Sequence, residues 1–222
     1  MASDHEIEVA LDNDVLLKAA CYGVALRFWP QAGAQPGVGV LGAARFVLRD
    51  AIERAGRVRD RAAAGRALEE LLALAAVLEP SDEEVEAAAE LERLAQRAGL
   101  PLDSGESQLA AMVTGRDIAW LHTGDKRAVA AFDRLADDST TCAALCGRVR
   151  CLEQLFLSVL SRTSVDFETI VSAVCAEPDL DKTTTICFAC HSGGAQTPGA
   201  VCAGLESYVR ALRNDAPRVL AA

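Results

Sequence analysis

Residues 117–132 read DIAWLHTGDKRAVAAF, and this stretch decides the fold class. The apolar run Ile118–His122 has the length and composition of a buried strand, and Asp125 stands where a helix is expected to begin. The same order occurs near the start of the chain, where Ile7–Leu11 is followed by the acidic turn Asp12–Asp14 and a helical pattern. Both stretches predict a strand that passes through an acidic turn into a helix.

The chain between these two stretches alternates in the same way. A Pro- and Gly-rich segment over residues 31–39 predicts a loop, and a capping box at Ser81 predicts a helix that Gly99 ends. The other elements expected in this part are helices over 40–55 and 61–72, a strand over 74–78, and a helix that begins near Glu106. Short apolar strands that alternate with amphipathic helices are typical of an α/β fold with a short, mostly parallel sheet.

The C-terminal part of the chain has a mainly helical pattern. Helices are expected over 139–162, 165–176 and 199–213, with a further short strand over 183–189. We therefore expect an α/β domain over residues 1–138 and a mainly helical extension over 139–222 that packs on it.

Composition limits the classes of protein to which this chain belongs. Its 222 residues carry 22 Lys and Arg against 32 Asp and Glu, and a net charge of −10 is unlike the basic surface of a nucleic-acid coat protein. The longest uncharged stretch, 183–205, includes His191, Gln196 and Pro198, so no transmembrane helix and no membrane partner are expected. The acidic N-terminal sequence is unlike a secretory signal, which predicts a cytoplasmic protein whose eight cysteines are reduced.

Three acids stand where predicted strands end or helices begin: Asp12, Glu106 and Asp125. In an open α/β sheet the carboxyl ends of the strands share one edge, so these side chains are expected to converge. Clustered carboxylates repel one another unless a cation holds them, and their oxygens suit Mg²⁺ or Mn²⁺. Such a site offsets the charge that builds on a phosphodiester during hydrolysis. The alternative is structural, because Asp and Glu also stabilise the first turn of helices.

Three segments together resemble the PIN domain family: LDNDVLLK (11–18), DSGESQLAA (103–111) and AWLHTGDKRAV (119–129). The resemblance covers roughly residues 7–135. It implies a three-layer α/β/α fold and a divalent-metal-dependent endoribonuclease that uses Mg²⁺ or Mn²⁺ and cleaves RNA.

The resemblance also assigns roles to individual residues. It implies that Asp12, Glu106 and Asp125 match the first, third and fourth acids of the family, and that they act as metal ligands and catalytic residues. Asp14 and Asp103 are implied to assist in holding the metal. Thr123 matches a position where the family often has a small hydroxyl residue, and it is expected to contact the substrate.

The chain departs from the family pattern at the second acid. That acid belongs on a helix between the first two motifs, where FVLRDAIER (46–54) offers Asp50 and Glu53 without a matching flanking pattern. The alternative function is therefore a catalytically degenerate PIN-like module that binds RNA or a protein partner such as an antitoxin. The sequence is also compatible with a homodimer.

Two basic residues follow Asp125 directly. In a site that handles phosphates, Lys126 and Arg127 would contact the substrate backbone. The alternative is that both belong to a solvated helix face.

A last motif carries cysteine chemistry. Cys187, Cys190 and His191 form a literal CxxCH, the pattern for covalent haem attachment. The same three residues, joined by Cys175 or Cys202, would make a zinc site. We expect neither, because the motif lies in an apolar run and lacks a second CxxC pair, and we predict reduced, metal-free thiols.

Overall fold

The computed structural model describes residues 7–29, 37–54, 56–162, 166–192 and 196–222. At its centre is a five-stranded, wholly parallel sheet with the strand order β3-β2-β1-β4-β5. The strands are β1 (Ile7–Leu11), β2 (Gly37–Leu41), β3 (Ala76–Leu78), β4 (Trp120–Thr123) and β5 (Val149–Cys151). The α/β class and the parallel sheet predicted from the sequence are confirmed.

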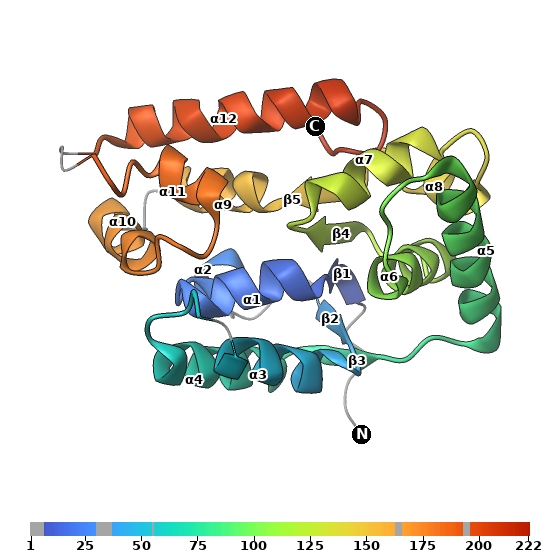
Figure 1. Ribbon diagram of the computed structural model, residues 1–222, viewed down its shortest axis with the longest axis horizontal. Coiled ribbons are helices and arrows are strands. Elements are labelled where there is room, and N and C mark those ends of the chain that lie inside the picture. The colour runs from blue at the N-terminus through green and yellow to red at the C-terminus, as the bar shows by residue number, and fades with distance from the viewer. Residues whose placement is uncertain (1–6, 30–36, 55, 163–165, 193–195) are drawn as a thin grey trace.

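Helices cover both faces of the sheet, which gives three layers (Figure 1). One face carries α1 (Asn13–Cys21), α2 (Ala25–Phe28), α3 (Ala44–Arg54), α4 (Arg61–Leu72), α9 (Leu152–Leu160) and α10 (Phe167–Ala176). The other carries α5 (Asp82–Ala98), α6 (Ser104–Gly115), α7 (Lys126–Arg134) and α8 (Thr140–Ala144). The remaining helices are α11 (Lys182–Cys187) and α12 (Pro198–Asp215).

The two cores follow from the alternation of side chains along each strand. In β1, Val9 and Leu11 are buried in the core on the α1 side, and Ala10 is buried in the core on the α6 side. Helix α12 spans both cores, because Val201 packs in the first and Leu212 in the second. The sheet is therefore buried on both faces, as parallel sheets require.

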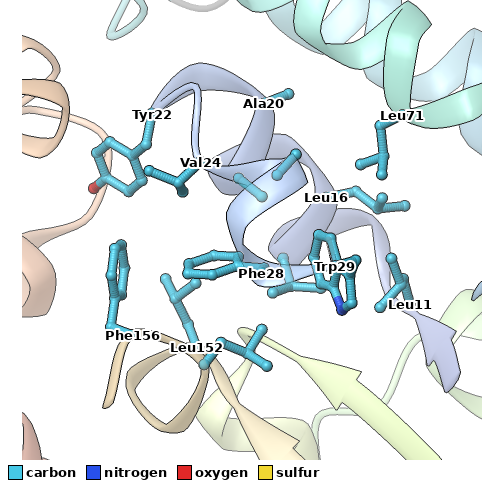
Figure 2. Close-up of a cluster of buried hydrophobic side chains, with 14 of the residues drawn as sticks. Leu11, Leu16, Ala20, Tyr22, Val24, Phe28, Trp29, Leu71, Leu152 and Phe156 are labelled. Atoms are coloured by element: carbon cyan, nitrogen blue, oxygen red, sulfur yellow. The ribbon is translucent and has the colours of Figure 1, made fainter. Parts of the chain in front are cut away.

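An aromatic cluster fixes the start of α1 (Figure 2). Leu11, directly before Asp12, and Leu16, four residues after it, point into this cluster beside Trp29. The rings of Phe28 and Phe156 meet edge to face with centroids 4.9 Å apart, and so join α2 to α9. The turn between β1 and α1 is thus held by packing on both sides.

The structure corrects two predictions in the sheet. Residues 37–41, expected as the end of a loop and the start of a helix, form β2, and its GVGVL sequence pairs in parallel with β1 and β3. The single helix expected over 139–162 is wrong, since it divides into α8, β5 and α9. Residues 31–36 of the expected loop lie outside the described residues. Strand β5 also shows that the sheet takes its last strand from beyond residue 138.

The C-terminal part differs from prediction in its cysteines. The strand expected over 183–189 is wrong, because Lys182–Cys187 form α11. A disulfide joins Cys175 and Cys190, whose Cα atoms lie 5.1 Å apart, so the expectation that every cysteine is reduced is wrong for this pair. The pairing arises because α10 and the turn after α11 lie side by side, a tertiary contact that sequence spacing does not reveal.

No helix in the described part of the chain has both the length and the apolar character needed to cross a membrane.

Candidate functional site

The strand order places the candidate acids together. The chain adds β2 and β3 on one side of β1 and then returns to add β4 on the other side, so the order reverses between β1 and β4. Crevices at such a reversal, outside the carboxyl ends of the strands, are the usual ligand sites of open α/β sheets. Asp12 follows β1 there, and Asp125 follows β4 after Thr123 and Gly124.

Asp12 stands at the N-cap of α1, but its side chain forms no capping hydrogen bond. Instead, Thr123 Oγ1 donates a hydrogen bond to Asp12 Oδ2 at 2.9 Å and accepts one from the Asp125 amide at 3.1 Å. The Thr123 hydroxyl therefore links the Asp12 side chain to the turn that carries Asp125. Asp12 is only 8% exposed, and burial raises its pKa to about 6, with the Thr123 bond opposing this shift and the charges of Asp14 and Asp103 adding to it.

Glu106 is the second buried acid of the group. It is N3 of α6 and forms a capping box with Asp103, since each side chain accepts a hydrogen bond of 2.9 Å from the other residue's amide. Burial raises the pKa of Glu106 to about 8, against the bond from the Asp103 amide and with the charges of Asp103, Asp12 and Asp125. Glu106 thus lies within electrostatic reach of both other candidate acids.

Asp125 is held differently, because it caps α7 and has its own cation. Its Oδ1 accepts from the Arg127 amide at 2.8 Å, and Arg127 Nη2 lies 2.7 Å from Oδ2. Burial acts to raise the pKa of Asp125, but the bonds from the Arg127 side chain and the helix amides outweigh it and hold the pKa below its ordinary value. Arg127, predicted to bind substrate, is exposed at the rim of the group.

A partly buried lysine that sequence analysis did not assign also belongs to this site. Lys18 Nζ lies 2.6 Å from Asp14 Oδ2 and 2.9 Å from Asp181 Oδ2, which caps α11. Burial acts to lower the pKa of Lys18, but the two carboxylates more than offset this and the pKa is raised. The Asp14–Lys18 spacing of four residues on one helix was a readable signal, whereas nothing local pointed to Asp181.

Gly124 permits this close arrangement. A Cβ atom at this position would lie 2.0 Å from Asp14 Oδ2 and 3.4 Å from Lys18 Nζ. A larger residue between Thr123 and Asp125 would therefore displace Asp14 and its ion pair. The five acids Asp12, Asp14, Asp103, Glu106 and Asp125 are called the carboxyl-edge cluster below.

Lys126, the other residue predicted to bind substrate, points elsewhere. Its Nζ lies 2.5 Å from Glu153 Oε1, donates to Thr183 Oγ1 at 3.0 Å and sits 5.5 Å from the centre of the Tyr208 ring. Glu153 is buried, so Lys126 supplies the charge that its burial demands. The structure therefore places Lys126 with the C-terminal helices and not with the carboxyl-edge cluster.

The candidates for the family's second acid are also absent from the cluster. Asp50 and Glu53 lie on the exposed side of α3, and Asp50 is ion-paired with Arg54. Neither is among the main causes of the raised pKa values of Asp12 and Glu106.

The donor chemistry of the cluster suits a hard divalent ion, since every candidate ligand is a carboxylate oxygen. In the described part of the chain, however, no three His, Cys, Asp or Glu side chains are grouped so that they could hold a metal ion. Glu106 and Asp125 are turned towards helix amides, and Asp125 also towards Arg127. The charges of Asp12 and Asp125 act on Glu106, but among the described residues the three acids do not form the shared metal-binding group that was expected.

The cysteine motif does not form a ligand set either. Cys190 is bonded to Cys175, which leaves Cys187 and His191 as the remaining members of the CxxCH pattern. Cys187 is buried against Gly204 of α12, and burial raises the pKa of its thiol to about 11. Among the described residues, no three His, Cys, Asp or Glu side chains are grouped there so that they could hold a metal ion.

Comparison with known proteins adds little. No protein-family model matches the sequence, and no curated protein matches it. Among solved structures, the chain is similar to the crystal structure of PAE2754 from Pyrobaculum aerophilum, with 18% sequence identity and a TM-score of 0.46. That similarity covers 70% of this chain and 97% of the other.

Proposed function

We propose that this protein hydrolyses phosphodiester bonds of RNA with the help of Mg²⁺ or Mn²⁺ held by the carboxyl-edge cluster. One observation carries the proposal: Asp12 is buried beside β4 at the point where the strand order reverses, and its side chain does not cap the helix that it precedes. Helix capping explains Asp125 and Glu106 at least in part, but it leaves Asp12 unexplained. A buried, uncapped carboxylate among other acids is a costly arrangement that a functional role would maintain.

The residues that would hold the ion are Asp12, Glu106 and Asp125, with Asp14 and Asp103 beside them. The ion supplies positive charge that offsets the charge on the phosphodiester as the bond breaks. The chain itself orients the acids: the Thr123 hydroxyl fixes Asp12, and Asp103 fixes Glu106. Arg127, at the exposed rim, is the residue available to a substrate phosphate.

A second candidate function has its own support. Lys18 and Arg127 already neutralise part of the cluster, Asp50 and Glu53 lie outside it, and no three-ligand group is formed among the described residues. These features favour a catalytically degenerate module that binds RNA or a protein partner. The two functions predict different responses to metal.

The test is cleavage of a single-stranded, fluorescently labelled RNA with Mn²⁺, comparing wild type with Asp12→Asn. We expect wild type to cleave, EDTA to stop the reaction, and Asp12→Asn to lose at least about 100-fold in rate because Asn keeps the shape but not the charge. The matched control is Asp60→Asn, because Asp60 caps α4 through a 2.8 Å bond from the Ala63 amide and Asn caps as well as Asp.

Thermal melting separates the two candidate functions. The nuclease proposal expects Mn²⁺ to raise the melting temperature of wild type and of Asp60→Asn, but not of Asp12→Asn. A wild-type protein that neither cleaves RNA nor responds to Mn²⁺ would favour the interaction module. Undiminished cleavage by Asp12→Asn would remove Asp12 from the mechanism.

A further inference from the structure

A second polar site lies away from the carboxyl-edge cluster, in a groove between α9 and α12 beside β5. It encloses about 520 Å³. Three arginines line it, Arg150 from β5 and Arg210 and Arg213 from α12, together with Glu206, Leu157 and Val209. This set of residues is called the arginine groove below. A volume of this size is within the range of small-ligand sites in proteins.

The Arg150 side chain forms no ion pair with a carboxylate of the described residues. Its guanidinium stacks on the Trp120 ring at 3.8 Å from the ring centre, which fixes its plane. Burial lowers the pKa of Arg150. A half-buried guanidinium without a counter-ion raises the free energy of the folded state, and an anion in the groove would remove that cost.

The neighbouring arginines are also not committed to acids. Arg213 Nη2 donates to the main-chain carbonyl of Ala221 at 2.6 Å, an uncharged acceptor that leaves other guanidinium donors available. Arg210 is exposed three residues earlier, on the same side of α12. Other arginines of the described chain do pair with acids: Arg116 pairs with Glu84, and Arg218 with Asp133 and Asp137.

The concentration of positive charge is unusual for this chain. Three arginines meet one acidic side chain, Glu206, and the α-carboxylate of Ala222 in the groove, so positive charge is in excess there although the whole protein has a net charge of −10. Guanidinium groups recognise the oxygens of phosphate through paired hydrogen bonds, and several of them together match its charge. Leu157 and Val209 add an apolar wall suited to a ring.

We infer that the arginine groove binds a phosphate-bearing ligand of nucleotide size. Arg150 and Arg210 contact the phosphate, and the apolar wall contacts the nucleoside. The inference does not rest on the proposed metal-dependent hydrolysis, because the groove shares no residue with the carboxyl-edge cluster.

The test is calorimetric titration of the full chain with adenosine monophosphate at low salt, in the presence of EDTA. We expect one equivalent to bind, Arg210→Gln to weaken binding by about tenfold, and Arg150→Met with Arg210→Gln to abolish it. Arg97→Gln is the matched control, since Arg97 is an exposed arginine in the last turn of α5 and lies outside the groove. Asp12→Asn should bind like wild type.

Two further probes define the ligand. Succinate, a dicarboxylate, should bind at least tenfold more weakly than adenosine monophosphate; equal binding would overturn the assignment to phosphate. A short single-stranded RNA with a 5′-phosphate distinguishes two sources of the ligand. If this RNA competes with adenosine monophosphate, the groove binds an RNA end. If the RNA does not compete, the groove binds a free nucleotide. Because Arg210 is exposed, Arg210→Gln should fold, and melting should verify this. No nucleotide binding by wild type, or equal binding by Arg210→Gln, would overturn the inference.

Discussion

Two helices of this protein begin with the same local motif and use it in opposite ways. Helix α5 begins with a capping box of Ser81 and Glu84, and α6 with a capping box of Asp103 and Glu106. In both, the glutamate is N3 of its helix, is buried and accepts a hydrogen bond from the N-cap amide. The local geometry of the two glutamates is therefore nearly the same.

Their surroundings differ in charge. Arg116 donates two hydrogen bonds to Glu84, at 2.7 Å and 2.6 Å, and these bonds hold the pKa of Glu84 below its ordinary value. Among the described residues no cation donates a hydrogen bond to the Glu106 side chain, which is affected by the charges of Asp103, Asp12 and Asp125. Burial raises the pKa of Glu106 to about 8. A capping box thus determines where a helix begins. Whether its glutamate stabilises the fold or belongs to a functional site depends on the residues that pack around it.

The largest expected contrast between the two boxes is in activity. If the carboxyl-edge cluster holds the metal, Glu106→Gln should lower Mn²⁺-dependent RNA cleavage by about 100-fold, because the amide keeps the helix cap and removes a ligand charge. Glu84→Gln should leave the rate of the folded protein unchanged. Rates are compared well below the melting temperature of each variant, and equal losses in both variants would point to a stability effect and not to a site.

The next contrast is in the dependence of stability on pH without metal. The folded state keeps the Glu106 proton up to a pKa of about 8, whereas the unfolded chain loses it near the ordinary glutamate pKa of 4.5. Raising the pH through this window should therefore remove about 2 to 4 kcal/mol more unfolding free energy from wild type than from Glu106→Gln, which keeps the smaller loss that the raised pKa of Asp12 causes up to about pH 6. Urea unfolding at several pH values in EDTA measures the difference.

Glu84 is the control for this prediction, because its contribution to stability changes with pH in the opposite direction. Its folded pKa is lowered, so the stability that it contributes is present above its unfolded pKa and is lost as the pH falls through the folded pKa. Glu84→Gln should therefore reduce the loss of stability in acid and leave the loss between pH 4.5 and 8 intact. The same loss in Glu106→Gln as in wild type would show that Glu106 has an ordinary pKa.

A smaller contrast concerns the partner of Glu84. Arg116→Met should lower the free energy of unfolding by about 2 kcal/mol at neutral pH, because it leaves a buried carboxylate without its two charged hydrogen bonds. Arg127→Met is the matched control: it removes a similar pair of bonds from Asp125, but Arg127 is exposed and a surface ion pair contributes little. Denaturant unfolding at pH 7 should show the larger effect in Arg116→Met.

Sequence analysis succeeded where the signal is local. Three features were predicted from short stretches of sequence that contain the whole pattern. They are the capping box at Ser81, strands β1 and β4, and the acids that follow these strands. It failed for β2 and β5, because GVGVL resembles a loop in its glycines and a strand of three residues has too few positions for a pattern. These strands exist because β1 and β4 offer edges for pairing.

The site shows the same division. The acids Asp12, Glu106 and Asp125 were identified from their places next to strands and helices, and in the structure the charges of Asp12 and Asp125 act on Glu106. The cations were missed or misplaced, since Lys18 reaches Asp181 and Lys126 reaches Glu153 through contacts between distant segments. The titration of a carboxylate depends on such contacts and therefore could not be predicted from the sequence.

The smallest expected effect comes from making the two boxes alike. Asp103→Ser gives α6 the N-cap that α5 has, and Ser and Asp cap helices about equally well, so stability at pH 5 should change by less than about 0.5 kcal/mol. The substitution removes a negative charge next to Glu106 and should lower the pKa of Glu106, by roughly one unit or less because burial is the larger cause of the shift. Carbon-detected NMR of the Glu106 carboxyl group against pH measures this directly. A pKa that falls to the ordinary value would show that Asp103, and not burial, separates the two glutamates; an unchanged pKa would show that the neighbouring charge plays no part in the difference.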